Sequence, residues 1–384
     1  MIKTIQNFNF INKKVLLRLD LNIPFGSDGI PLDNTRIIAV LPTLKFLLKA
    51  GAIIIIVSHL GRPNGKYNKA LSLKKMIPFL KSDWQVNINF CECLLSFEDK
   101  SARITLCENL RFYQQELDND INFSKQLASL ADVYVNEAFS CSHRFHASIV
   151  GVTAFLPSFA GLLLAKEVKN INDILHGNYK QKTAIIGGKK ISTKLPLLKS
   201  LAQEVDYIFV VGAMANSLFK LLGMSIGKSF YQNVPEAKKM YEEYKDKIIL
   251  PVDLICDNNG SVLMKDVGQI SAEDIIYDIG LLSLEKMTNI LHKSDLVLWN
   301  GPVGLYEQEQ YAVSSLQVAR VIAAATKKKK LLSIVGGGDA VAVVNKTGLA
   351  HYFSHISTGG GAFLEFLTQR EIIGVKKLKE SING

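Results

Sequence analysis

Short runs of aliphatic residues recur along the chain, and most are followed by a polar or glycine-rich turn and then by a segment with helical spacing. The run 52–57 is continuously aliphatic, which is typical of a strand covered on both faces of a parallel sheet. The alternation predicts parallel sheets with helices on both faces. We predict strands at Val15–Leu19, Ile53–Val57, Ile104–Leu106, Val133–Asn136, Ala184–Ile186, Tyr207–Val211, Ile248–Leu250, Leu296–Trp299, Leu331–Val335 and Ile356.

Helical periodicity is clear over Thr35–Ala50 and Ala312–Ala325, and a third helical segment, Gly161–Asn178, lies near the midpoint between two groups of strands. A chain of 384 residues is too long for one ordinary core. We therefore predict an α/β protein with two doubly wound, Rossmann-like parallel-sheet domains over residues 1–165 and 166–369. The segment 161–178 would join them as a hinge helix.

The composition is that of a globular protein, with 48% hydrophobic and 21% charged residues. The aliphatic run 52–57 is far shorter than the roughly 20 residues of a membrane span, and the first residues lack the apolar core of a secretory signal. The five cysteines include no C-x-x-C pair. We expect reduced thiols in a cytoplasmic protein with no membrane partner.

A net charge of +10 raises the question of a nucleic-acid partner. Residues 1–165 carry 18 Lys and Arg against 13 Asp and Glu, and the remainder carries 27 against 22, so each part holds +5. No segment interleaves arginines with aromatic residues. We expect no nucleic-acid partner, and the spread of charge fits a lysine-rich surface or the steering of small phosphorylated ligands.

Basic residues follow the strands of the first half. In a doubly wound sheet, ligands bind beyond the carboxyl ends of the strands. Arginine there offers planar, bidentate donation to phosphate or carboxylate. This pattern predicts a small polyanionic ligand, and the residues that carry it are Arg36, His59, Arg62, Arg111 and Arg144.

Glycine-rich turns follow the strands of the second half. Glycine lets backbone N–H groups approach an anion closely, and a helix N-terminus adds its dipole. The pattern predicts a nucleotide whose phosphates lie over helix N-termini. Asp339 could bind Mg²⁺ there or could be an ordinary helix N-cap. The turns are 187–190, 212–216, 300–304, 336–339 and 357–361.

The segment Gly223–Ser229 looks like a Walker A loop but has one residue too few between its glycines and follows a helical segment. We therefore do not interpret it as a phosphate-binding loop. No G-x-G-x-x-G occurs either, so a nicotinamide site has little support.

Eight motifs, in register along nearly the whole chain, resemble the phosphoglycerate kinase family. They are RLDLNIP (18–24), DNTRI (33–37), SHLGRP (58–63), ENLRF (108–112), AFSCSHRFHAS (138–148), WNGPVGLYE (299–307), GGGDA (336–340) and HISTGGGAFLEF (355–366).

This resemblance implies reversible phosphoryl transfer between 1,3-bisphosphoglycerate and ADP, giving 3-phosphoglycerate and MgATP. The first domain would bind the glycerate ligand through Asp20, Leu21, Asn22, Arg36, His59, Leu60, Gly61, Arg62, Arg111 and Arg144. The second would bind the nucleotide through Gly188, Lys190, Lys194, Gly212, Asn300, Glu307, Gly337, Gly338, Asp339 and Ala340. Glu307 matches the position that binds the ribose, and Asp339 the Mg²⁺ ligand.

Phosphoryl transfer depends on positioning and charge stabilisation more than on covalent catalysis. Arg36 and Lys190 would neutralise the transferring group, and backbone N–H groups near Gly336 and Gly359 would complete its cradle. Ligands on separate domains require closure about a hinge, which the helix near 161–178 would supply. The resemblance also implies a monomer, with the tail 370–384 packed on the first domain.

Several positions depart from the family pattern. Ala340 replaces a hydroxyl residue, Glu137 replaces Asp, and Lys189 replaces a small residue. Ser140, Cys141 and Phe145 replace Gly, Thr and Ala. These changes bear on efficiency more than on identity.

Two other interpretations remain open. A catalytically weak relative could be kept as a binding or scaffold protein, because fold alone does not fix function. A coupled assay with 3-phosphoglycerate and MgATP separates that interpretation from an enzyme. A dehydrogenase or other nucleotide enzyme would instead bind a nicotinamide cofactor, which a fluorescence titration detects.

Overall fold

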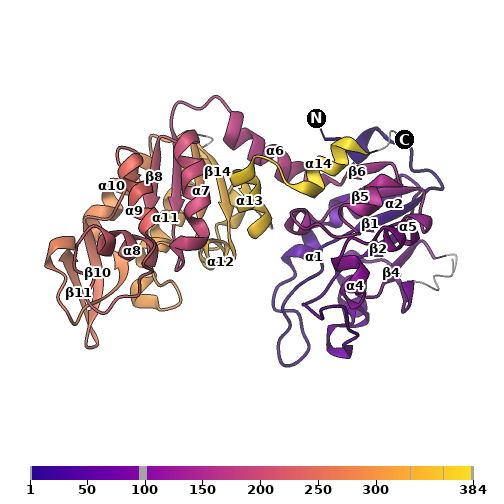
Figure 1. The fold of residues 1–384 in the computed structure, drawn as a ribbon, viewed down its shortest axis with the longest axis horizontal. Coiled ribbons are helices and arrows are strands. Elements are labelled where there is room, and N and C mark those ends of the chain that lie inside the picture. Colours follow the sequence, from indigo (N-terminus) through magenta and orange to yellow (C-terminus); the bar gives the residue numbers. More distant parts are fainter. Residues whose placement is uncertain (1, 95–101, 329, 358, 382–384) are drawn as a thin grey trace. The chain divides into compact units, whose positions relative to one another are not determined.

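The computed structural model describes residues 2–94, 102–328, 330–357 and 359–381. It divides into two compact units, Met1–Lys169 with Glu371–Gly384, and Asn170–Arg370 (Figure 1). The boundary falls inside helix α6 (Leu162–His176), a few residues after the position predicted. Thr358 of the last glycine-rich turn and residues 382–384 of the tail lie outside the described residues.

The first unit is built on a six-stranded parallel sheet with the order β3-β4-β2-β1-β5-β6. Two short strands, β3 and β6, were not predicted, because three-residue runs carry too little periodicity to recognise. The strands are β1 (Lys14–Arg18), β2 (Ile53–Val57), β3 (Asn89–Cys91), β4 (Ile104–Cys107), β5 (Val133–Asn136) and β6 (Ser158–Ala160).

The helix predicted over Thr35–Ala50 is wrong as a single element, because the structure has two helices there. Pro42 lies in the first turn of the second helix and has no N–H to continue the ladder of the first. The helices of this unit before α6 are α1 (Thr35–Ala39), α2 (Leu41–Lys49), α3 (Ile77–Trp84), α4 (Gln114–Leu117) and α5 (Ile121–Ser129).

The C-terminal segment belongs to the first unit. Its helix α14 (Ile373–Glu380) packs beside β6, and the Gly374 N–H donates to the Ser142 carbonyl oxygen at 2.7 Å (Figure 1). The tail therefore contacts the segment that follows β5.

Strand order reverses beside β1 in the first unit. The chain runs from β1 to β2 on one side of it and returns to β5 on the other. A reversal separates the two following loops and leaves a crevice, the usual ligand position in doubly wound sheets. The loops at this position begin at Leu19 and Glu137.

The second unit repeats this plan with a six-stranded parallel sheet of order β15-β14-β13-β7-β8-β9, which reverses between β7 and β13. Its strands are β7 (Lys182–Ile186), β8 (Tyr207–Val210), β9 (Ile248–Ile249), β13 (Leu296–Asn300), β14 (Leu332–Gly336) and β15 (His355–Ile356). Its helices after α6 are α7 (Ile191–Glu204), α8 (Ala213–Leu221), α9 (Pro235–Glu243), α10 (Leu281–Leu291), α11 (Val313–Lys327), α12 (Gly338–Lys346) and α13 (Gly361–Gln369).

A three-stranded antiparallel sheet of order β11-β10-β12 also belongs to the second unit and was not predicted. It contains β10 (Asp253–Asn258), β11 (Ser261–Asp266) and β12 (Ile275–Ile279). Asn259 and Gly260 link the first two strands with φ values of 50° and 89°. An Asn-Gly pair between two strands is a strong hairpin signal, so the sequence did contain the information.

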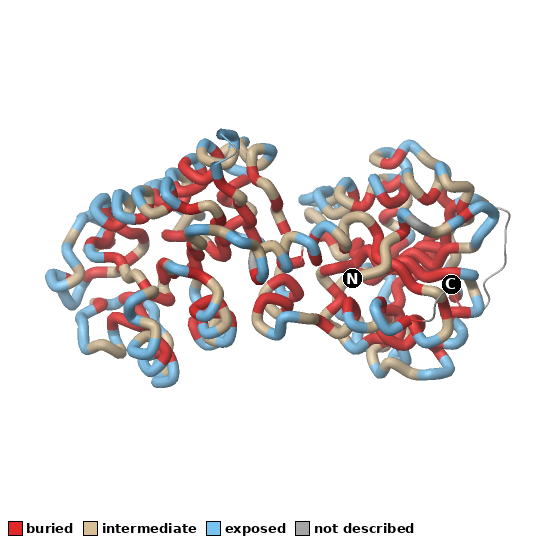
Figure 2. The backbone as a smooth tube through the Cα atoms, turned by 90° about the horizontal axis from the view of Figure 1, so that it is seen from above, coloured by how far each residue is buried: buried red, intermediate tan, exposed pale blue. Residues whose placement is uncertain are grey.

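The buried residues follow the central strands of each sheet (Figure 2). The aliphatic strands β1 and β2 form the middle of one core, and Trp299 on β13 lies fully buried in another. Among the helices in the described part of the chain, none combines the length and apolar composition needed to cross a bilayer.

A buried carboxylate binds the first turn of α6. Glu137 accepts hydrogen bonds from the N–H groups of Leu163 at 3.0 Å and Leu164 at 3.1 Å, and from the Thr43 hydroxyl. Burial raises the pKa of Glu137 to about 7, although these donors oppose the rise. Glu137, which replaces the family's Asp, is therefore a buried titratable group bonded to the first turn of the helix that crosses the unit boundary.

We predict that Glu137 makes the first unit less stable as pH rises from about 4.5 to about 7. Its folded pKa lies above the 4.5 of an ordinary Glu, so the folded state holds the extra proton and loses that advantage when the carboxyl ionises. The span of about 2.5 units corresponds to about 3 kcal/mol. In Glu137→Gln the free energy of unfolding should lack this component.

Urea unfolding at several pH values measures this pH-dependent part of the free energy of unfolding. Trp84 and Trp299 are the two tryptophans, one in each unit, so a Trp299→Phe background makes Trp84 fluorescence report the first unit. Asp118→Asn, at an exposed acid in the same unit, is the matched control. The same pH slope in Glu137→Gln and in the parent would contradict the prediction.

Candidate functional site

The loops after β1 and β2 are joined by hydrogen bonds between predicted site residues. Arg36 donates to the Asp20 carboxylate at 2.6 Å and to the Asn22 carbonyl oxygen at 2.9 Å. The Asn22 side-chain oxygen accepts the Gly61 N–H at 2.8 Å. Helix α1 and the loops that follow two neighbouring strands thus hold Asp20, Asn22, Arg36 and Gly61 in one place.

Arg111 lies in the short 3₁₀ helix Leu110–Phe112 that follows β4, and it reaches the same loops. Its guanidinium donates to the Gly61 carbonyl oxygen at 2.7 Å, yet its Nε and Nη2 are buried without a hydrogen-bond partner. Arg111 is only 3% exposed. Buried donors without partners are costly, so this geometry favours an anion as the missing acceptor.

Arg144 and two histidines follow β5 and add to the positive charge near Arg111. Arg144 Nε and His143 Nδ1 are also buried without a hydrogen-bond partner, and His146 Nδ1 lies 3.7 Å from Glu116 Oε1 without a hydrogen bond. Burial, followed by the charge of Arg111, lowers the pKa of His146 to about 3. Burial also lowers the pKa of Arg111 itself to about 10, and the charge of Arg144 contributes.

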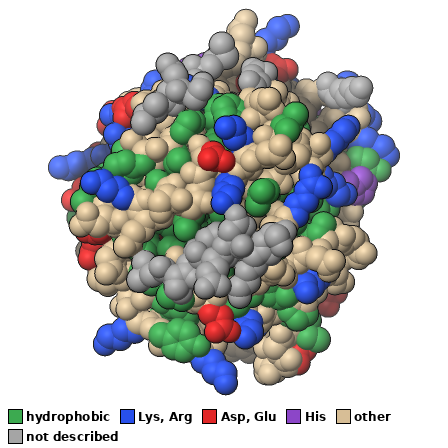
Figure 3. Space-filling model, turned by 90° about the vertical axis from the view of Figure 1, so that its right-hand side faces the viewer, with side chains coloured by type: hydrophobic (Ala, Val, Ile, Leu, Met, Phe, Trp, Pro, Cys, Tyr) green, Lys and Arg blue, Asp and Glu red, His purple; other side chains and the backbone are tan. Residues whose placement is uncertain are grey.

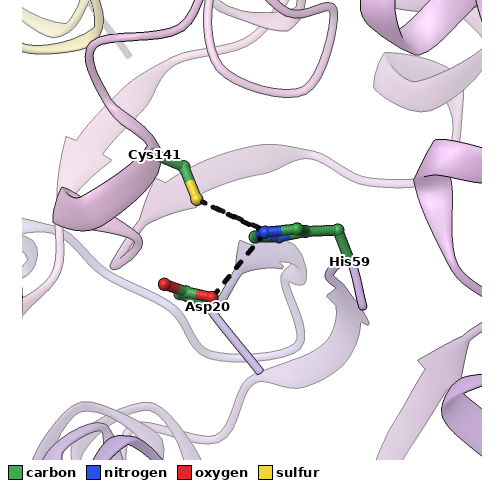
Figure 4. Close-up of side chains that lie close together, drawn as sticks. All are labelled: Asp20, His59 and Cys141. Carbon is green, nitrogen blue, oxygen red and sulfur yellow. Dashed lines mark hydrogen bonds and ion pairs between the residues drawn. The ribbon is translucent and has the colours of Figure 1, made fainter. Parts of the chain in front are cut away.

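His59 lies between Asp20 and Cys141 (Figure 4). The three side chains offer ligand atoms within 4.8 Å of one another, the spacing of a metal site. The surrounding charge argues against a cation. Arg36 already binds Asp20, and the charges of Arg18, Arg111, Arg144 and Arg36, after burial, hold the pKa of His59 well below its usual range. We therefore interpret the cluster as part of an anion site.

Two of the residues that differ from the family pattern lie in or beside this cluster. The Ser140 hydroxyl donates to the Asp20 carboxylate, and Cys141 Sγ lies 3.9 Å from both ring nitrogens of His59. Phe145 is 60% exposed, so its bulk is directed largely into solvent. Ser140 thus supplies Asp20 with a donor that a glycine would lack.

The remaining predicted residues of the first unit are not part of this hydrogen-bonded cluster. Leu21 and Leu60 are buried, and the Leu21 N–H donates to the Ser58 hydroxyl at 3.0 Å. Arg62 lies in the loop after β2 but is exposed. The structure brings together Asp20, Asn22, Arg36, His59, Gly61, Arg111 and Arg144.

A cavity of about 460 Å³ lies in the second unit. Four predicted nucleotide residues line it, Gly188, Gly212, Glu307 and Asp339, and its other walls include Leu254 and Ile276 from the antiparallel sheet. Its size and largely apolar walls suit a small organic ligand. The unpredicted strands β10 and β12 therefore form part of this candidate site.

Lys194 and Asn300 connect the two loops at the strand-order reversal. Lys194 Nζ donates to the Asn300 side-chain oxygen at 2.6 Å and to the Gly187 carbonyl oxygen at 2.7 Å. Burial lowers the pKa of Lys194 to about 8, and the charge of Asp339 opposes this shift. Asn300 Nδ2 is buried without a partner, so it remains available as a donor.

The glycines occupy backbone positions that favour glycine. Gly188, Gly212 and Gly337 have φ values of 115°, 65° and 88°. Gly212 and Gly337 are the N-caps of α8 and α12, so each turn leads into a helix N-terminus. A Cβ at Gly337 would lie 3.0 Å from Asn300 Nδ2, which shows how closely these loops approach.

Other predicted residues of the second unit do not line the cavity. Lys190 is exposed at the N-cap of α7, and Gly338 is exposed at the start of α12. Gly336 ends β14, Ala340 is fully buried, and the Gly359 N–H donates to the Ser357 hydroxyl.

Asp339 is a residue of this cavity that could hold a magnesium ion. Its carboxylate lines the cavity in the first turn of α12 and also contacts the Tyr306 hydroxyl, whose pKa is raised by burial and by Asp339. One exposed carboxylate beside a nucleotide-sized cavity fits the Mg²⁺ preference for one or two carboxylates plus phosphate oxygens.

Sequence reasoning missed two features of these sites. Lys189 lies over the Phe230 ring at 4.8 Å, and both line the cavity. Arg18 is fully buried and contacts His59, although strand periodicity alone assigns it to the sheet. The segment 223–229, which we did not interpret as a phosphate-binding loop, follows helix α8 and no strand, as predicted.

On the face of the molecule shown in Figure 3, Lys and Arg side chains are spread among acidic and apolar groups. They do not form a continuous basic stripe on that face.

Three comparisons place the chain among known proteins. A family model described as phosphoglycerate kinase matches residues 5–370. A curated phosphoglycerate kinase of Wolbachia pipientis subsp. Culex pipiens is 41% identical over 391 residues, which cover 98% of each chain. Another, from Orientia tsutsugamushi strain Ikeda, is 41% identical and covers 97% of this chain and 96% of its own.

Solved structures of phosphoglycerate kinases also match this chain. Phosphoglycerate kinase from Coxiella burnetii superposes with a TM-score of 0.89 at 33% identity, covering 99% of both chains. The enzyme from Pyrococcus horikoshii gives 0.83 at 28% identity over 98% of both. They confirm the predicted α/β fold class with its parallel sheets. The family model, the relatives and the shared fold together show that this chain belongs to the phosphoglycerate kinase family.

Proposed function

We propose that this chain transfers a phosphoryl group reversibly between 1,3-bisphosphoglycerate and ADP, giving 3-phosphoglycerate and MgATP. Its family membership supports this activity. The observation that carries the proposal is chemical: among the described residues, the buried arginine donors without a hydrogen-bond partner lie in the first unit, and a nucleotide-sized cavity bordered by glycine turns lies in the second.

The first unit would bind the glycerate ligand. Arg111 and Arg144 would donate to its phosphate or carboxylate oxygens, because their buried Nε groups have no protein acceptor. Arg62 is exposed at the same loop and would add a further donor. Asp20 and Asn22 would orient these groups, and the loop 59–61 would fix the remaining oxygens.

The second unit would bind the nucleotide. Its base would lie against the apolar walls of the cavity, with the ribose near Glu307 and the phosphates near the glycine turns at 188, 212 and 337–338. Lys194 and Asn300 would hold these turns in place through their hydrogen bonds. The backbone N–H of Ala340 would add a donor. Asp339 would hold Mg²⁺, which neutralises phosphate charge when bound.

The chemical step needs no general base, because an ADP phosphate oxygen is already an anionic nucleophile. Arg36 and Lys190 would stabilise the charge of the transferring group, and backbone N–H groups near Gly336 and Gly359 would cradle it. Closure about α6 would bring the two ligands together and exclude water. We further propose that the enzyme is a cytoplasmic monomer.

We predict that Lys190→Ala lowers kcat by about 100-fold, the usual cost of one charge-stabilising donor. The Lys190 side chain is exposed and has no hydrogen bond or ion pair with another described residue, and its carbonyl oxygen, which accepts from the Thr193 hydroxyl, is kept in alanine, so folding should be unaffected. The assay couples 3-phosphoglycerate and MgATP to the oxidation of a reduced nicotinamide.

Lys199→Ala is the matched control, because Lys199 is an exposed lysine on the same helix, α7. Its activity should equal that of the parent. Equal turnover in Lys190→Ala and the parent, or no turnover above background in the parent, would reject the proposed function.

We also predict that Arg111→Met weakens 3-phosphoglycerate binding by about 30-fold and leaves ADP binding unchanged. Loss of charged hydrogen bonds to an anion costs about 2 kcal/mol. Calorimetric titration with each ligand alone measures both affinities.

Arg103→Met, which changes an exposed arginine of the same unit, provides the control. If Arg111→Met weakened the binding of both ligands equally, or of neither ligand, the assignment of the glycerate site to this cluster would be wrong.

A further inference from the structure

We propose that Arg18 is a positioning residue that fixes the proton of a neutral His59 on Nε2. Arg18 ends β1 and is fully buried, and its Nη2 lies 3.2 Å from His59 Nδ1. A guanidinium group has donors and no acceptor. His59 Nδ1 must therefore accept, and the single proton of the neutral ring must lie on Nε2.

Arg18 is itself held in a fixed orientation. Its Nε donates to the Ser148 hydroxyl at 2.9 Å, and its Nη1 donates to the Leu19 carbonyl oxygen. The Ser148 hydroxyl donates in turn to the Glu116 carboxylate at 2.6 Å, and the Ser148 N–H donates to it at 2.9 Å. Each nitrogen of the guanidinium thus has one partner, and that of Nη2 is His59.

Glu116 supplies the counter-charge for this arrangement. It is fully buried on α4, where burial raises its pKa and the charge of Arg18 opposes the rise. Arg18 thus compensates the charge of Glu116 through Ser148 and presents Nη2 to His59. A chain of three contacts connects α4 to the loop after β2.

Charged groups face His59 from several elements. They are Arg18 on β1, Arg36 on α1, Arg111 after β4 and Arg144 after β5, with Asp20 after β1 as the acid. Asp20 Oδ1 lies 3.9 Å from Nε2, beyond hydrogen-bond distance, and Cys141 Sγ lies at 3.9 Å from the ring (Figure 4). Burial and the arginines keep the pKa of His59 well below its usual range.

His59 would therefore be a neutral hydrogen-bond donor surrounded by arginines. His59 would present Nε2–H to an anionic oxygen of the ligand without adding a charge that the arginines would repel. Because its pKa lies low, that donor would persist unchanged across the physiological pH range. The tautomer assignment depends only on the contacts of the first unit, whereas the identity of the ligand rests on the proposed function.

The test is long-range ¹H–¹⁵N NMR of the ligand-free protein labelled in histidine, with His59 assigned by the signal lost in His59→Gln. We expect an unprotonated Nδ1 and a protonated Nε2 that do not change between about pH 6 and pH 8. A protonated Nδ1, a mixture of tautomers, or titration in this range would overturn the proposal.

Two variants separate positioning from a purely structural role of Arg18. Arg18→Met is combined with Glu116→Gln so that no buried charge is left unpaired. In this pair the fixed tautomer should be lost and His59 should titrate closer to its ordinary pKa. Arg18→Lys keeps the charge and should keep the low pKa. An unchanged His59 spectrum in the paired variant would show that Arg18 does not set the tautomer.

Binding of 3-phosphoglycerate supplies the second readout. The Kd of the paired variant divided by the Kd of the parent should fall by at least about threefold when the pH is lowered from 8 to 6. The reason is that His59 of the paired variant gains a proton and then attracts the anionic ligand. A constant ratio would contradict the proposal. If the parent bound no 3-phosphoglycerate, the proposed function would fail, while the NMR spectrum would still decide the tautomer.

Discussion

The two sites depend on one constraint, which is the reversal of strand order in each parallel sheet. At a reversal the loops from two neighbouring strands turn in opposite directions and leave a crevice between them. The crevice beside β1 receives Asp20 and the segment after β5, and that between β7 and β13 receives Gly188 and Asn300. The same backbone plan thus serves two different ligands.

The two crevices differ in the source of their donors. In the first unit, side chains supply them, because buried N–H groups of Arg111 and Arg144 have no protein acceptor. A bound anion would supply that acceptor. In the second unit, helix N-termini after Gly212 and Gly337 supply backbone N–H groups, and Lys194 braces the turns. Arginine clusters suit a small, highly charged ligand, whereas backbone turns and apolar walls suit a nucleotide.

The sequence allowed much of this to be predicted, because strand-end position and residue type are local properties. Arg36, Arg111 and Asp339 could be identified from their places in the segments after the strands. The break before Pro42 and the hairpin at Asn259–Gly260 also had local signals, which the periodicity of longer segments concealed. The contact between Arg18 and His59 had none. It joins β1 to the loop after β2 through side chains, and residue spacing does not indicate which way a buried arginine points.

Hydrogen exchange measured with one ligand at a time tests the central claim, that each unit holds its own ligand, most directly. With 3-phosphoglycerate, slowed exchange is expected in the segments 20–22, 59–62 and 140–144 of the first unit. With MgADP, it is expected in 188–194, 212–216 and 300–307 of the second unit. Protection of the same unit by both ligands, or of neither unit by either ligand, would contradict the account.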